Sequence, residues 1–166
     1  MYQIEKLIAL QRKVESWGKK VGLYDPENGS NLLNQYLYAF AEFGEAAQDE
    51  LKGKEEGLID GIGDTFVCLV HAQKFLYGKD FHIMKFRIDE FGDHSVREIL
   101  SRVPDYIVKN DFNSAVTLLI MISHKITGKP YKCFETAYNE IKDREGRMIS
   151  GVFLKRQTLE EQGIWD

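Results

Sequence analysis

The segment from residue 55 to 76 constrains the fold of this chain more than any other. It has helical periodicity and is apolar almost all the way round from Ile62 to Val70, a pattern typical of a helix at the centre of a bundle. The sequence predicts covering helices at about residues 4–21, 31–51, 96–103, 112–126 and 134–146. Only residues 152–154 suit a short strand or an extended arm. We therefore expect an all-α antiparallel helical bundle.

The domain organisation follows from the same pattern. We expect residues 1–146 to form a single all-α domain, with residues 79–117 as a helical insertion and residues 147–166 as a C-terminal tail. Within the second helix, Ser30 is the expected N-cap, and the helix carries one apolar face at three- and four-residue steps: Leu33, Leu37, Phe40, Gly44, Ala47 and Leu51. A monomer would struggle to cover so much apolar surface, so we expect a homodimer or homotetramer.

Composition excludes several classes of function. The 22 basic and 26 acidic residues give a formal net charge of −4, which argues against a general nucleic-acid binder. The longest mostly apolar stretch, residues 115–122, is too short to span a bilayer, and the first eight residues lack the pattern of a signal peptide. We expect a cytoplasmic protein with no membrane partner, in which Cys68 and Cys133 are reduced core thiols.

Four carboxylates on the second and third helices form the most informative constellation. Glu42 and Glu45 lie about 60° apart on one helix, and Asp60 and Asp64 form an i, i+4 pair on the next. Two adjacent antiparallel helices would bring all four together, where they would repel one another unless a cation neutralised them. Oxygen-only ligands suit Mg²⁺ or Mn²⁺. The alternative is an ordinary solvated acidic face.

Two glycines lie between Asp60 and Asp64 on the third helix. Gly61 and Gly63 each cost a helix about 1 kcal/mol relative to alanine. A sequence tolerates that cost where another backbone or a ligand must come close. The pattern therefore predicts close approach at the centre of the bundle.

The run from Glu42 to Glu45, followed after a spacer by Asp60-Gly61-Ile62-Gly63-Asp64, resembles the E-x-x-E … E-x-x-D signature of MazG-like all-α nucleoside triphosphate pyrophosphohydrolases. Gln35 also falls where many members carry Gln, and residues 137–153 are similar to the last helix and tail of small bacterial and phage-type members. Gly61 stands where the signature has Glu, and Asp60 can substitute for it because it faces the same stripe.

The resemblance implies hydrolysis of an NTP or dNTP to the monophosphate and pyrophosphate. Glu42, Glu45, Asp60 and Asp64 would hold Mg²⁺ or Mn²⁺, with Glu42 and Glu45 as the catalytic residues and Glu45 taking a proton from the attacking water. The expected substrate-binding residues are Gln35, Tyr38, Asn139, Lys142 and Arg144. Members of the family assemble as dimers or tetramers.

Other readings of the sequence stay open. Within the same enzyme class, the chain also suits a phosphoribosyl-ATP pyrophosphohydrolase or a dimeric dUTPase-like protein. Outside that class, the alternative is a non-catalytic helical interaction module with a degenerate metal site, which Gly61 and Ala41 favour because family members carry Glu at those positions.

Overall fold

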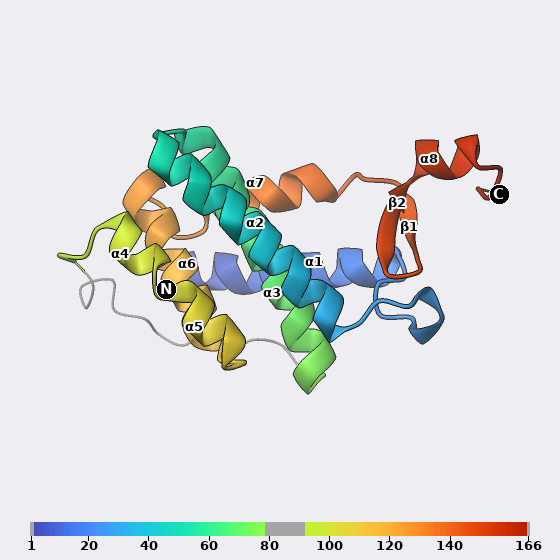
Figure 1. Cartoon of the computed structure of the whole chain (residues 1–166), viewed down its shortest axis with the longest axis horizontal. Helices are drawn as coiled ribbons and strands as arrows, with labels where there is room; N and C mark the ends of the chain where they lie inside the picture. Colours follow the sequence, from blue (N-terminus) through green and yellow to red (C-terminus); the bar gives the residue numbers. More distant parts are fainter. Residues whose placement is uncertain (1, 79–91, 166) are drawn as a thin grey trace.

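The computed structural model describes residues 2–78 and 92–165 of the chain, and these residues are mostly helical (Figure 1). The helices are α1 (Tyr2–Lys20), η1 (Pro26–Asn28), α2 (Leu32–Lys52), α3 (Glu55–Tyr77), α4 (Val96–Leu100), α5 (Val103–Val108), α6 (Phe112–Thr127), α7 (Lys132–Ile141) and α8 (Arg156–Glu161), and the strands are β1 (Gly146–Ile149) and β2 (Val152–Lys155). The expectation of an all-α bundle is confirmed at this level, with a two-stranded hairpin added near the C-terminus. Part of the expected insertion, residues 79–91, lies outside the described residues. No described helix combines the length and apolarity needed to cross a bilayer.

Helix α3 is the centre of the bundle, as its sequence predicts. It packs against α1, α2, α6 and α7, and Leu58, Ile62 and Leu69 along it are almost completely buried. Phe66 of α3 stacks on Phe134 of α7 with ring centroids 4.0 Å apart. Each such buried side chain contributes about 1.5–3 kcal/mol to folding, so the bundle depends most heavily on this helix.

Helices α2 and α3 form an antiparallel hairpin. Gly53 ends α2 in the left-handed conformation with φ 67°, which lets the chain reverse within two residues. The expected N-cap was wrong by one residue, because the chain is still extended at Asn31 and the Asn31 side chain accepts a hydrogen bond from the backbone N–H of Asn34 at 3.1 Å. Ser30 is instead buried before the helix begins.

The two glycines of α3 let neighbouring helices approach closely, as the sequence predicts. A Cβ atom on Gly61 would lie 2.8 Å from the Cβ of Ala46 and 3.0 Å from the carbonyl oxygen of Glu42, both on α2. A Cβ on Gly63 would overlap the carbonyl of Cys133 and lie 2.8 Å from the Cβ of Ala137, both on α7. Helix α2 therefore packs closely on α3 at Gly61, and α7 packs closely on α3 at Gly63.

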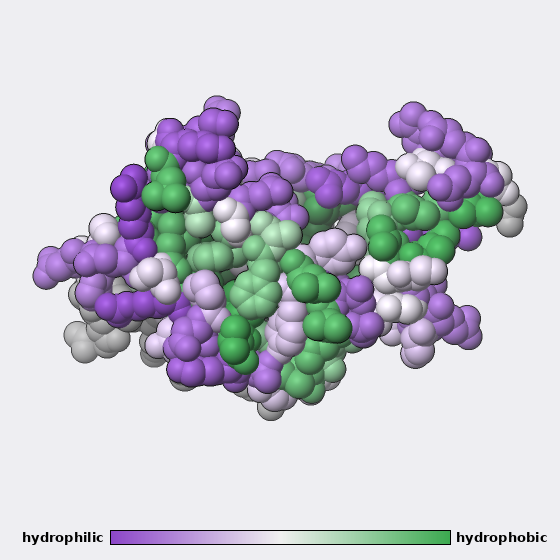
Figure 2. Space-filling view, viewed as in Figure 1, coloured by the Kyte–Doolittle hydropathy of each residue, from purple (hydrophilic) through white to green (hydrophobic). Residues whose placement is uncertain are grey.

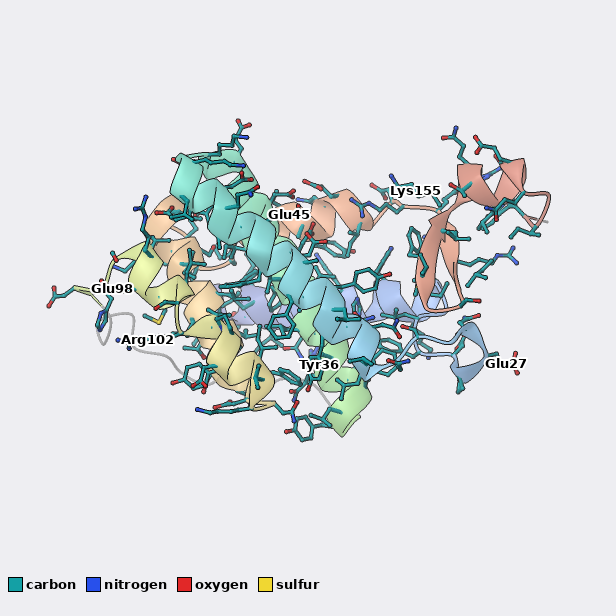
Figure 3. The ribbon with its side chains drawn as sticks, in the orientation of Figure 1. Glu27, Tyr36, Glu45, Glu98, Arg102 and Lys155 are labelled. Carbon is teal, nitrogen blue, oxygen red and sulfur yellow. The ribbon has the colours of Figure 1, made fainter. Side chains whose placement is uncertain are left out.

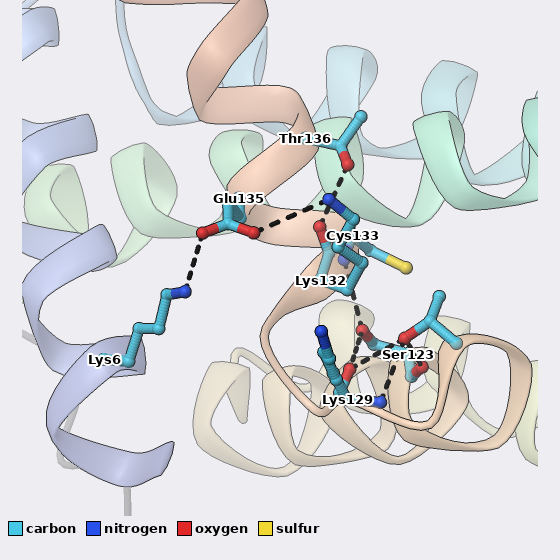
Figure 4. A network of polar contacts seen from close by, with 8 residues as sticks. Lys6, Ser123, Lys129, Lys132, Cys133, Glu135 and Thr136 are labelled. Carbon is cyan, nitrogen blue, oxygen red and sulfur yellow. Dashed lines mark hydrogen bonds and ion pairs between the residues drawn. The ribbon is translucent and has the colours of Figure 1, made fainter. Parts of the chain in front are cut away.

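Polar contacts fix α7 in place at its N-terminal end (Figure 4). The buried hydroxyl of Ser123 on α6 accepts a hydrogen bond from the backbone N–H of Cys133 at 3.2 Å and donates to the carbonyl of Lys129 at 2.9 Å. On the other side, Lys6 of α1 forms an ion pair with Glu135 of α7 at 2.7 Å. Helix α7, which carries Asn139 and leads into Lys142 and Arg144, is thus held from both α1 and α6.

The segment between residues 96 and 108 differs from the expectation. A single helix ending near Pro104 was predicted, but α4 ends at Leu100 and Pro104 lies in the first turn of a second helix, α5. Proline lacks a backbone N–H, and the first turn of a helix leaves that group without a partner anyway. Pro104 therefore starts a helix here and does not terminate one.

The C-terminal tail folds back onto the bundle. The expected strand at residues 152–154 lies within β2, which pairs antiparallel with β1. The backbone N–H of Met148 on β1 donates to the carbonyl of Val21 at 3.0 Å, and the Met148 side chain is buried beside Leu23 in a small second core. This hairpin forms one wall of a cavity that it shares with α1, α2 and α3.

Candidate functional site

A cavity of about 320 Å³ opens between α1, α2, α3 and the β1–β2 hairpin. One part of its lining is apolar or aromatic and includes Trp17, Met148 and Phe153. The other part carries the charged side chains Glu42, Asp64 and Arg144. The cavity therefore combines an apolar wall with a small set of charged groups, as binding sites for small molecules do.

The register of the α2–α3 hairpin separates these two parts. Gly57 lies against Asp49 and Gly61 lies against Ala46. Residues that face each other across the hairpin therefore have numbers that add to 106 or 107, and Asp64 lies opposite Glu42. By the same count, His71 lies opposite Gln35, two helical turns further along. The cavity has an acidic end and an aromatic end as a direct result of this antiparallel packing.

At the acidic end, Glu42 and Asp64 line the cavity, and Asp60 interacts electrostatically with both, whereas Glu45 interacts with Glu42. Burial raises the pKa of Glu42, and repulsion from Glu45 and Asp60 raises it further, while Arg144 opposes the shift. Burial raises the pKa of Asp64 from 3.8 to about 7, with further repulsion from Asp60 and Glu42. These carboxylates are thus held where negative charge is poorly compensated.

The donor set fits a hard divalent cation in charge and in chemistry. All four side chains offer carboxylate oxygens, the donors that Mg²⁺ and Mn²⁺ prefer. One oxygen of Asp60, Oδ1, is buried without a hydrogen-bond partner, so it retains a lone pair for a ligand. However, within residues 2–78 and 92–165, no three His, Cys, Asp or Glu side chains are grouped closely enough to hold a metal ion. A cation would have to draw side chains from both helices together.

Position 61 explains how this chain departs from the E-x-x-D half of the signature. A glutamate there would have to pass through the space that Ala46 and the α2 backbone occupy. Asp60, one residue earlier, is only partly buried and interacts electrostatically with both Glu42 and Asp64. The packing of α2 on α3 therefore excludes an acidic side chain at 61 and leaves Asp60 as the nearest available carboxylate.

The expected substrate-binding residues divide between two places. Gln35, Tyr38 and Arg144 line the cavity, and Arg144 also lies 3.8 Å from Glu140 on the preceding turn. Asn139 and Lys142 instead line a separate hollow between α1 and α7, beside Lys6 and Lys13. Asn139 lies on α7, Lys142 directly follows that helix, and Arg144 lies in the turn beyond it. The structure therefore does not place Asn139 and Lys142 in the lining of the cavity that holds Glu42 and Asp64.

At the aromatic end, Trp17 lies with its ring centroid 5.6 Å from that of Phe153 and 6.0 Å from that of His71. The Tyr24 hydroxyl shares a hydrogen bond of 2.7 Å with Nδ1 of His71. Burial lowers the pKa of His71 to about 3, so the imidazole is neutral at physiological pH. Trp17 Nε1 and His71 Nε2 are both buried without a hydrogen-bond partner.

Sequence reasoning did not place Met148 and Phe153 at the site. They come from a hairpin wall whose contact with α1 is made only in the folded chain. The available signal was the tail motif around Gly151, which marks a turn but not what the turn packs against. Cys68, expected as a core thiol, also lines the cavity, and burial together with Glu42 and Asp64 raises its pKa well above the usual value.

Comparison of the chain with protein-family models, with curated proteins and with solved structures finds no match in any of the three.

Proposed function

We propose that this protein hydrolyses a nucleoside triphosphate to the nucleoside monophosphate and pyrophosphate, with the help of a divalent cation. The observation that carries the proposal is the juxtaposition, in one cavity, of poorly compensated carboxylates with an aromatic wall. A nucleotide has matching halves, since its triphosphate brings a cation to the carboxylates and its base is a flat ring that stacks on aromatic side chains. The resemblance of the acidic pairs to the MazG-like signature points to the same reaction.

In this proposal Glu42, Glu45, Asp60 and Asp64 hold Mg²⁺ or Mn²⁺ at the acidic end. When bound, the cation neutralises phosphate charge and polarises the phosphoryl group. Burial raises the pKa of Glu42 and Asp64 and mutual repulsion raises it further; the positive charge would offset both effects. The acidic end is thus suited to receive a cation together with its phosphate ligand.

The exposure and charge of Glu45 and Arg144 suggest a role for each in the reaction. Glu45 is exposed on α2 (Figure 3) and interacts electrostatically with Glu42, and its carboxylate would accept a proton from the attacking water. The water oxygen bonds to phosphorus, and the P–O bond of the bridge between the α and β phosphates breaks, which releases pyrophosphate. The guanidinium of Arg144, which lines the cavity, would stabilise the charge that develops on the phosphates.

The aromatic end would hold the base. Trp17 and Phe153 supply stacking surfaces, and Gln35 is buried on α2 at the edge of the cavity. The indole N–H of Trp17 has no hydrogen-bond partner, and an acceptor atom on the base would satisfy it. Binding at this end would position the triphosphate toward Glu42 and Asp64.

A panel of NTPs and dNTPs incubated with Mg²⁺ or Mn²⁺ tests the proposal, with pyrophosphate and orthophosphate assayed separately. We expect cation-dependent release of pyrophosphate from a subset of nucleotides. Glu45→Gln and Asp64→Asn should each lower turnover by at least about 100-fold, the usual effect of losing a general base or a metal ligand. Glu5→Gln, an exposed change on α1, is the matched control. Unchanged turnover in both site variants, with helical circular dichroism intact, would refute the assignment.

One observation favours a second candidate. Among the described residues, no three His, Cys, Asp or Glu side chains lie close enough together to hold a metal ion. The chain therefore also suits a non-catalytic helical interaction module with a degenerate metal site. Calorimetric titration with Mg²⁺ and Mn²⁺ separates the two functions. Absence of both cation binding and turnover across the nucleotide panel would support the interaction module.

A further inference from the structure

The apolar face predicted on α2 is exposed in the structure. We call the residues Leu33, Leu37, Phe40, Gly44, Ala47 and Leu51 the α2 seam. Leu33, Leu37 and Leu51 are 64%, 62% and 71% exposed, while the bundle core is contacted by the opposite side of α2, through Gln35, Ala39, Phe43 and Ala46. Figure 2 shows hydrophobic surface gathered along the course of α2. Within the described part of the chain, nothing covers these leucines.

The spacing of the α2 seam is that of a coiled-coil contact. Its steps of four, three, four, three and four residues repeat with a period of seven, which keeps the side chains facing one partner helix over five turns. A seam of this kind calls for a matching helix that lies nearly parallel or antiparallel to α2.

The order of side-chain sizes identifies that partner as a second copy of α2. If two copies run antiparallel about a two-fold axis, Phe40 faces Gly44 of the partner subunit and Leu37 faces Ala47 of the partner subunit. Leu33 faces Leu51 of the partner subunit at each end. No atom lies within 4 Å of the position that a Cβ on Gly44 would take, so space is open there for an aromatic ring. Large side chains thus meet small ones on both sides of the axis.

Charge and shape agree with this pairing. The α2 seam carries no charge, and the residues beside it at the same seven-residue spacing are Asn34, Ala41 and Gln48 on one side and Tyr36, Phe43 and Glu50 on the other. Glu50 forms an ion pair with Arg97 at 3.1 Å, and in an antiparallel pair it lies at the opposite end of the contact from Glu50 of the partner subunit. Two copies can therefore meet here without bringing like charges together. At one end, Ala47 and Leu51 border a hollow of about 240 Å³ that Leu100 and Pro104 also line, where Leu33 of the partner subunit would fit.

We propose that the protein forms a two-fold dimer through antiparallel contact of its α2 seams. Gln35 and Glu42 lie on the other side of α2, so the dimer leaves the cavity open. The proposal does not depend on the activity proposed above.

Analytical ultracentrifugation of the full chain tests the dimer. The expected mass is twice the 19.2 kDa of the chain, and Leu37→Glu should weaken association at least about 100-fold by burying unpaired charge. Val108→Glu is the matched control, because Val108 is also an exposed apolar residue, at 70%, but lies on α5. Circular dichroism checks that each variant is folded. A monomer at all concentrations up to about 100 μM, well above the Kd of a stable dimer, would overturn the proposal, as would association that Leu37→Glu does not weaken.

Two further variants test the register. Gly44→Leu has space in the single chain but meets Phe40 of the partner subunit, so it should weaken the dimer without loss of helicity. Under oxidising conditions, the double variant Leu33→Cys with Leu51→Cys should form disulfide-linked dimers, whereas Leu33→Cys alone should not. Efficient cross-linking by Leu33→Cys alone would overturn the antiparallel arrangement. A tetramer that Leu37→Glu reduces to dimers would support the seam, as one of two interfaces.

Discussion

Replacement of His71 by glutamine should change how the stability of the protein depends on pH. His71 is only 3% exposed, and burial lowers its pKa from 6.5 to about 3. In the unfolded chain the imidazole binds a proton below about pH 6.5. The contribution of neutral His71 to stability is therefore complete above pH 6.5 and is lost progressively as the pH falls toward 3.

The magnitude follows from the separation of the two pKa values. At about pH 4.5, two pH units below the value in the unfolded chain, the loss is about 2–3 kcal/mol at 1.36 kcal/mol per unit. Such a loss is a large part of the total stability of an ordinary domain. The raised pKa values of Glu42 and Asp64 favour the folded protein as the pH falls, which is opposite to the effect of His71. Both carboxyl groups are present in every variant compared, so their effect cancels from the difference between variants.

Urea denaturation followed by circular dichroism at about pH 7.5 and pH 4.5 measures the effect. The wild-type protein should lose about 2–3 kcal/mol more than His71→Gln between the two pH values. His124→Gln, which removes a histidine from α6, should follow the wild type. Equal losses for the wild type and His71→Gln would refute the argument that a buried neutral imidazole lies behind the cavity.

Two predictions concern the packing of α7. Gly63→Ala should destabilise the protein by about 1–3 kcal/mol, despite better helix propensity, because the new methyl group overlaps the carbonyl of Cys133; denaturation at a higher urea concentration than the wild type would contradict this. Ser123→Ala should cost about 1–3 kcal/mol, because the buried N–H of Cys133 loses its acceptor. Thermal unfolding measures the Ser123 effect, and Ser101→Ala, on the surface, should change stability by less than about 0.5 kcal/mol.

Much of the acidic end of the cavity could be predicted from the sequence. The spacing of Glu42 and Glu45 on one helix and of Asp60 and Asp64 on the next depends only on helical geometry. A short connection at Gly53 makes the two helices antiparallel neighbours, and this suffices to bring Glu42, Asp60 and Asp64 within electrostatic reach of one another, with Glu45 beside Glu42. Their role in binding a cation stays a prediction.

Other parts of the site depend on contacts between distant segments. Asn139 and Lys142 line one hollow and Arg144 lines the other, and this separation depends on how α7 and the turn after it pack on the bundle. Gly63 contributes to that packing because it lets the α7 backbone approach α3. Sequence periodicity shows which residues share a face of a helix, but it does not show which neighbouring helix that face contacts. The sequence alone therefore could not assign Asn139, Lys142 and Arg144 to one of the two hollows.

The sequence by itself determined the five longest helices, α1, α2, α3, α6 and α7, together with the central position of α3 and the close approach at Gly61 and Gly63, because these follow from local periodicity and from the absence of a side chain. Only the tertiary structure decided which side of α2 faces the core. Both sides of α2 are apolar enough to be buried, and the choice depends on fitting Ala39, Phe43 and Ala46 against α3 and its neighbours. The same packing leaves the α2 seam at the surface and folds the hairpin over the cavity, since both result from long-range contacts that no local pattern encodes.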